Sequence, residues 1–250
     1  LGGENNIIYP TSPYAFIGGG EGHNIFNSDF AFIGGGEDAY ISSSVSTAIV
    51  GGSNNKILSS QYSFIGGGSS SRMESSAYSG IIAGAGHEIS SSIFTIIGGG
   101  EDNYIITASY SAIVGGKHNV ISGSDPSYPY RGYNFIGGGL QHLISASNYA
   151  TIVGGHHNAI VAGHNIDRPL GQETTDSNGS AMVGGYGNII SGSSNAMIAG
   201  GVENFIAVQS HKSFIGGGYK SYIRQSPNSV IVGGTLNTID HYWHSKKVNT

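Results

Sequence analysis

The sequence predicts an all-β fold, a parallel β-solenoid of about fourteen coils with 16 residues in each. Three observations predict it. An aliphatic residue, followed by a glycine pair or triplet, recurs at first every sixteen residues, and a second aliphatic residue stands eight positions after each one. The chain also holds 43 Gly among its 250 residues, with many Ser and aromatic residues. This composition suits tight turns and short strands better than helices.

The aliphatic residue two positions before each glycine pair, which we call the anchor, defines the coils; in one unit Ala83-Gly84 replaces the pair. The anchors are Ile17, Ile33, Ile49, Ile65, Ile81, Ile97, Ile113, Ile136, Ile152, Met182, Ile198, Ile215 and Ile231. A partial unit before the first anchor supplies Gly2, Gly3, Asn6 and Ile8. The repeat therefore covers residues 1–240 as one domain, and residues 241–250 are expected to form a cap or a junction to a further domain.

The anchor segment is expected to be a strand with both faces covered. The residues before and after the anchor vary together, as in Phe16 with Gly18 and Ala48 with Val50. Residues two apart share one face of a strand, so this compensation indicates one shared volume. Because the anchor on the opposite face is also apolar, we expect other copies of the chain to cover the second face, and we predict a homotrimer.

Glycine follows the anchor two and three positions later. The third position is Gly in every unit, at Gly20, Gly36, Gly52, Gly68, Gly84, Gly100, Gly116, Gly139, Gly155, Gly185, Gly201, Gly218 and Gly234. Such columns indicate a positive φ or a close approach of backbones at every level. We expect both columns to be tight, so that Gly67→Val overcrowds the column and weakens assembly.

Asparagine recurs six residues after the anchor, with His23, His87 and His142 among its substitutes. Asn tolerates left-handed turns, and stacked amides can bond along a column. We therefore expect a structural turn ladder there.

The second half of each unit is expected to face outward. It holds one Ser column and one aromatic column, and every departure from the 16-residue spacing falls in it. The Ser column is Ser28, Ser44, Ser60, Ser76 and Ser92, and the aromatic column is Tyr14, Phe30, Tyr62, Tyr78, Phe94, Tyr110, Tyr133 and Tyr149. Two insertions, at 122–135 and 161–181, supply the candidate receptor contacts Tyr128, Tyr130, Arg131, Tyr133, His164, Asp167, Arg168, Glu173 and Asp176.

Composition excludes several classes of function. Net charge is −5, only 10% of residues are charged, and no basic stripe occurs, so nucleic acid is not an expected partner. No apolar run reaches the roughly 18 residues that a membrane span needs, so membrane insertion is not expected. We predict no cofactor.

Units such as Ser63-Phe64-Ile65-Gly66 and Ser229-Val230-Ile231-Val232-Gly233 resemble the head repeats of trimeric autotransporter adhesins, and similar glycine-rich repeats occur in phage tail fibres and tailspikes. The resemblance implies a left-handed β-roll, three chains around one axis, and attachment at a virion or cell surface. We therefore expect an extracellular, receptor-binding segment of a trimeric phage tail fibre or spike. A bacterial surface adhesin head is the alternative, and the expected receptor is a cell-surface glycan or an outer-membrane protein.

Other activities have weaker support in the sequence. A glycan-degrading tailspike would need paired carboxylates, but Asp167, Glu173 and Asp176 lie on one loop without a supporting strand. We therefore expect no enzyme activity and no catalytic residue.

Calcium and ice binding also have weak support. The acidic pair Glu37-Asp38 does not recur regularly enough for a calcium ladder, and the Ser column lacks the regular Thr of an ice-binding face. Five histidines, His118, His142, His156, His157 and His164, fall in consecutive coils, yet we predict no metal site.

Overall fold

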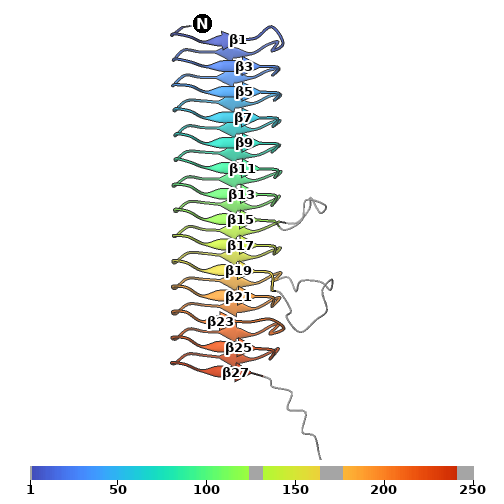
Figure 1. Cartoon of the computed structure of the whole chain (residues 1–250), viewed down its shortest axis with the longest axis vertical. Helices are drawn as coiled ribbons and strands as arrows, with labels where there is room; N and C mark the ends of the chain where they lie inside the picture. The colour runs from blue at the N-terminus through green and yellow to red at the C-terminus, as the bar shows by residue number, and fades with distance from the viewer. Residues whose placement is uncertain (1, 124–131, 164–176, 241–250) are drawn as a thin grey trace, which may run out of the picture.

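The computed structural model describes residues 2–123, 132–163 and 177–240. In these residues the chain winds into one tall column of stacked coils (Figure 1). All of the secondary structure described is short parallel β-strands, joined by turns. The prediction of an all-β parallel solenoid is confirmed, and the structure has about 13 turns of about 16 residues.

Each coil contributes one strand to each of two sheets, which have 14 and 13 strands. The odd-numbered strands are β1 (Ile7–Ile8), β3 (Asn24–Phe26), β5 (Tyr40–Ser42), β7 (Lys56–Leu58), β9 (Arg72–Glu74), β11 (Glu88–Ser90), β13 (Tyr104–Ile106), β15 (Val120–Ser122), β17 (Leu143–Ser145), β19 (Ala159–Val161), β21 (Ile189–Ser191), β23 (Phe205–Ile206), β25 (Tyr222–Arg224) and β27 (Thr238–Asp240). The even-numbered strands, which hold the anchors, are β2 (Phe16–Ile17), β4 (Phe32–Ile33), β6 (Ala48–Ile49), β8 (Phe64–Ile65), β10 (Gly80–Ile81), β12 (Ile96–Ile97), β14 (Ala112–Ile113), β16 (Phe135–Ile136), β18 (Thr151–Ile152), β20 (Ala181–Met182), β22 (Met197–Ile198), β24 (Phe214–Ile215) and β26 (Val230–Ile231).

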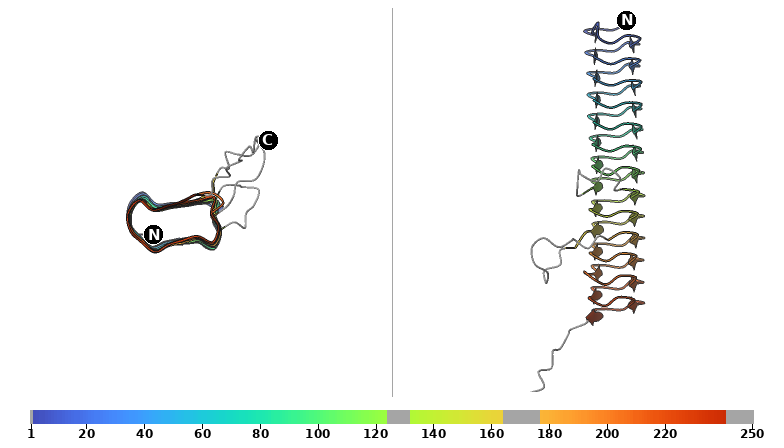
Figure 2. Two further views of the ribbon diagram at one scale, coloured as in Figure 1. Left: turned by 90° about the horizontal axis from the view of Figure 1, so that it is seen from below. Right: turned by 90° about the vertical axis from the view of Figure 1, so that its right-hand side faces the viewer.

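The core is a double column of aliphatic side chains between the two sheets. Register is kept coil after coil, so that Ile65 pairs with Ile81 in one sheet and Ile57 with Met73 in the other. Seen along the axis, the coils superpose as one flattened loop (Figure 2). Apart from Ile231 at 6%, the anchors are at most 1% exposed. Each buried Ile contributes about 1.5–3 kcal/mol, so the repeated pair supplies the main stabilisation of every coil.

The second and third positions after the anchor differ, although both are rich in glycine. At the third position φ lies between 82° and 109°, and a Cβ would collide with the glycine of the next coil. At Gly67, in the second position, a Cβ would meet no atom within 4 Å, and Ala83 already stands in that column. The expectation that Gly67→Val would overcrowd the chain was therefore wrong, because this column faces open space within one chain.

The Asn column forms a ladder as predicted, but its side chains point inward. Asn103 is fully buried, and its Nδ2 donates to the carbonyls of Gly99 at 3.0 Å and Gly116 at 2.9 Å. Its Oδ1 accepts the backbone N–H of Asn119 in the next coil at 3.0 Å. The left-handed residue is the preceding one, for example Asp102 with a φ of 50°. The amides therefore satisfy the backbone of the turn from inside it.

The Ser column also lies inside the coil, which corrects the expectation that it faces outward. Ser28, Ser44, Ser60, Ser76 and Ser92 are all fully buried. Ser60 Oγ donates to the carbonyl of Leu58 at 2.8 Å and accepts the N–H of Ser76 at 3.0 Å. Small hydroxyls are used here because each one satisfies two backbone groups in a narrow turn that no large side chain could enter.

Candidate binding surfaces

Both insertions interrupt the same turn of the coil. The first opens after Gly123 and closes at Gly132, whose backbone pairs with Ser109 of the previous coil. The second opens after Gly163 and closes at Ser177, whose hydroxyl donates to the carbonyl of Val161 at 2.8 Å. The prediction that length variation is confined to this half of the coil is confirmed for the described residues on either side of each insertion.

The aromatic column of the sequence forms a stack of rings along this edge, which we call the aromatic ladder; its residues are exposed except for the half-buried Tyr110. Its unbroken part is Tyr62, Tyr78, Phe94, Tyr110, Tyr133 and Tyr149, with successive ring centroids 4.8–5.1 Å apart. Interplanar angles are at most 20°, so the ring faces cover one another. Every ring residue has φ between 52° and 58°, a left-handed conformation that is uncommon outside Gly and Asn. The ring edges and phenol groups therefore form the surface of this part of the column.

Of the candidate receptor contacts, the structure places Tyr133 alone. Its ring lies in the aromatic ladder, 4.8 Å from that of Tyr110 and 5.0 Å from that of Tyr149. The other eight candidates lie outside the described residues: Tyr128, Tyr130, Arg131, His164, Asp167, Arg168, Glu173 and Asp176. Residues 241–250, expected to form a cap or junction, lie outside them as well.

The outer face of the even-numbered sheet is apolar from one end of the column to the other. It is built from the residues before and after each anchor, where Thr151 is the one polar side chain and no residue is charged. Ile96 is 44% exposed and Val114 is 55% exposed. A Cβ at Gly66 would lie 3.1 Å from the ring of Phe64, which shows that the paired residues do share one volume. We call this surface the apolar face; within a single chain it is open to solvent.

The outer face of the odd-numbered sheet has a different composition. It mixes apolar residues with Lys56, Arg72, Glu74 and Glu88, and Arg72 pairs with Glu74. Ion pairs also join residues that come directly after the third-position glycines, as between Lys117 and Glu101. The charged side chains of the described strands thus lie on the odd-numbered sheet, whereas the even-numbered sheet carries none.

Three histidines replace Asn in the internal ladder. The Nδ1 atoms of His23, His87 and His142 accept backbone N–H groups of the next coil at 3.0, 3.1 and 3.2 Å. The neutral imidazole with its proton on Nε2 is therefore required at these positions. Burial lowers the pKa of all three imidazoles below its usual value. These residues are parts of the fold, and sequence reasoning had recognised their column as structural.

The remaining histidines and the acidic residues form no metal site in the part of the chain that the structure describes. His156 and His157 stack against each other with ring centroids 4.2 Å apart, whereas His142 points inward. Asp102 Oδ2 lies 3.7 Å from Nδ1 of His118.

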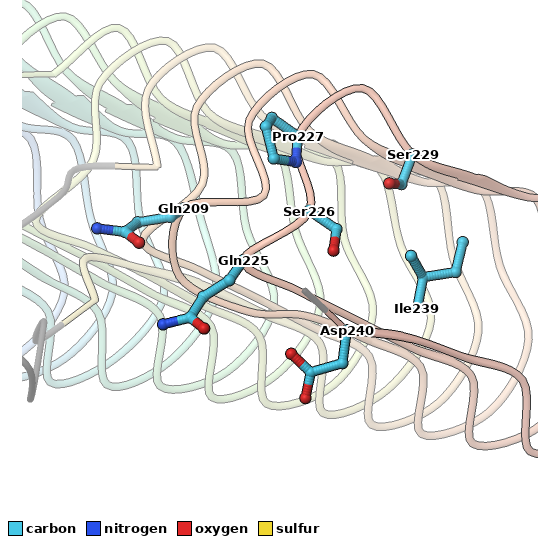
Figure 3. Close-up of a pocket in the computed structure, with 7 residues that line it drawn as sticks. All are labelled: Gln209, Gln225, Ser226, Pro227, Ser229, Ile239 and Asp240. Carbon is cyan, nitrogen blue, oxygen red and sulfur yellow. The ribbon is translucent and has the colours of Figure 1, made fainter. Parts of the chain in front are cut away.

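A hollow of about 650 Å³ lies at the end of the column that β27 closes. Its lining is Gln209, Gln225, Ser226, Pro227, Ser229, Ile239 and Asp240 (Figure 3). In the other coils the residues equivalent to Ile239 and Ser226 are covered by the next coil, so the hollow is the open end of the core after β27.

Comparison with known protein families and with characterised proteins finds no match for this chain. Among the described residues, no helix has the length and apolar character that crossing a membrane requires.

Proposed function

We propose that the chain is a structural and receptor-binding segment of an extracellular trimeric fibre, of the kind found in phage tail fibres and spikes. The observation that carries this proposal is the apolar face. It continues over 13 strands, which at about 4.8 Å for each strand gives a strip ~60 Å tall without a charged side chain. A soluble single chain rarely leaves such a long apolar surface in water, whereas copies packed around an axis would bury it.

The open glycine column supports the same arrangement. Glycine recurs at the second position after the anchor, although a Cβ at Gly67 would contact nothing within its own chain. This column borders the apolar face, and glycine there would let a second backbone approach closely. Gly67→Val therefore tests assembly and leaves the internal packing of one chain unchanged.

A matched pair of substitutions tests whether the apolar face is the interface. Ile96 on β12 and Ile106 on β13 both point outward, but on opposite sheets. We expect Ile96→Lys to lower the mass in solution to that of one chain, because a buried charge at the interface has no partner. Ile106→Lys should leave the mass unchanged; if both variants keep the oligomer, the apolar face is not the interface.

Deletions that restore the regular coil test receptor binding. The spacing between Ile152 and Met182 exceeds the regular 16 residues by 14, and removal of 163–176 joins Ala162 directly to Ser177. Removal of 125–131 likewise restores a spacing of 16 between Ile113 and Ile136 and leaves Ser124 in the Ser column. Labelled protein would be added to a panel of bacterial strains and to a glycan array. We expect the double deletion to lose binding and keep its oligomeric mass; unchanged binding would contradict the role of the insertions.

A further inference from the structure

The aromatic ladder has a gap at Ser46, which stands where the neighbouring coils carry a ring. On one side Phe30 stacks on Tyr14 with centroids 4.9 Å apart, and on the other side Tyr62 stacks on Tyr78 at the same distance. Within the described residues, each ring beside the gap has one stacked face and one face turned toward the missing rung.

The gap has room for one flat group. Two rungs of about 4.9 Å separate the rings of Phe30 and Tyr62 by roughly 10 Å. A planar group at the missing rung would lie about 5 Å from each ring centroid, which is the spacing at which the rings of the intact ladder stack on one another. The intact part of the ladder shows how such a group fits, since each of its inner rings lies between two others in the same way.

An acidic residue, Asp29, comes directly before one of the two rings that border the gap. Ser46 N–H donates to the backbone carbonyl of Asp29 at 2.9 Å, which fixes Asp29 in the adjacent coil, directly before Phe30. Asp29 is half-buried, and the structure gives its carboxylate no hydrogen bond or ion pair with a described residue. On the other side of the gap Gln61, which precedes Tyr62, is exposed and uncharged. A flat cation at the missing rung would thus meet two ring faces, and the residues directly before those rings are one acid, Asp29, and one uncharged amide, Gln61.

We propose that this gap, which we call the ring slot, binds the guanidinium group of an arginine side chain presented by a protein partner. Guanidinium is planar, always charged and weakly hydrated, and it stacks on aromatic faces. A lysine ammonium has the same charge but cannot fill a flat space between two rings. The inference deepens the receptor-binding part of the proposed function, because it assigns one chemical group of the receptor to one position on the column.

Binding of two small probes to the full chain tests the proposal. The probes are N-acetyl-L-arginine amide and N-acetyl-L-lysine amide, and saturation-transfer NMR follows the signals of the probe. We expect the arginine probe to bind roughly three- to tenfold more tightly than the lysine probe, as stacking on ring faces predicts. Equal affinity of the two probes would overturn the proposal.

Substitutions then locate the site. Ser46→Tyr should complete the ladder, as a ring already occupies the same left-handed backbone at Tyr62, and should abolish binding of the arginine probe. Asp29→Asn should weaken that binding and reduce the preference over lysine. Unchanged binding by either variant would overturn the proposal.

A rebuilt slot provides the matched positive control. Tyr78→Ser opens the same gap between Tyr62 and Phe94, and Gln61→Asp places an acid before the first of these rings. We expect the double variant to bind about twice as much arginine probe as the unmodified chain; no gain would contradict the geometry. Light scattering of the same samples separates the two proposals, because the substituted residues are not part of the apolar face and the variants should keep the oligomeric mass.

Discussion

Replacing Asn103 with alanine should strongly destabilise the column at one defined level. The fully buried side chain makes three hydrogen bonds, two from Nδ2 to carbonyls and one from the N–H of Asn119 to Oδ1. Each hydrogen bond makes a net contribution of about 0.5–1.5 kcal/mol to stability, and a buried N–H left without a partner costs about 1–3 kcal/mol. We therefore expect a loss of about 3–5 kcal/mol around this coil.

Hydrogen exchange measures this loss where it occurs. The Asn119 amide should exchange roughly 10²- to 10⁴-fold faster in Asn103→Ala, since about 1.4 kcal/mol corresponds to a factor of ten. Asn103→His is the control, because His87 fills the same role one coil earlier, and it should change the exchange rate by less than about tenfold. A loss below about 1 kcal/mol in the alanine variant would refute the view that the ladder stabilises the turn.

Two further predictions concern the buried histidines and the two glycine columns. Burial lowers the pKa of the imidazoles of His23, His87 and His142 in the folded chain. In the unfolded chain these imidazoles have the usual histidine pKa of about 6.5, so as the pH falls below that value the unfolded chain binds more protons than the folded chain. The stabilisation is therefore complete above that pH and is lost as the pH falls toward the lowered pKa. The urea midpoint should decrease from pH 7.5 to pH 5, and the decrease should be smaller when all three histidines are replaced by Asn; equal decreases would contradict the prediction. Gly52→Ala should destabilise the column by about 2–5 kcal/mol, because Gly52 has a φ of 89° and a Cβ there meets the next coil. Gly67→Ala leaves the packing within one chain unchanged and should therefore lower the melting temperature less. Equal melting temperatures of the two variants would contradict this difference.

The periodicity of the sequence was sufficient to predict the fold. Anchors such as Ile65 and the aliphatic residues eight positions later are apolar in every coil, and these are the residues that fill the core. The shared volume of Phe64 and Gly66 could also be predicted, because the two residues lie on one face of a strand and vary together.

Whether the small polar side chains point into the coil or toward solvent could not be predicted from their hydrophilic character. Ser60 is fully buried because its hydroxyl bonds to backbone groups of its own coil and the next. Composition alone favours an exposed position for Ser, and only the path of the backbone through the turn shows the opposite. The two glycine columns look alike in sequence for a similar reason, although only the one containing Gly52 is crowded.

The candidate binding residues were harder to predict than the fold. A repeat constrains only the positions that recur, and the insertions follow no column. Tyr133 could be placed because it also belongs to the aromatic ladder. The ring slot was not recognised from the sequence, although a signal was present in the single Ser46 between aromatic rungs.

The mass of the segment in solution tests the proposed assembly most directly. Light scattering coupled to size-exclusion chromatography should give three times the 25.7 kDa of one chain, with the apolar face buried between copies. A stable monomer at 25.7 kDa would contradict the trimeric fibre, since the charge-free face of all 13 even-numbered strands would then remain in water.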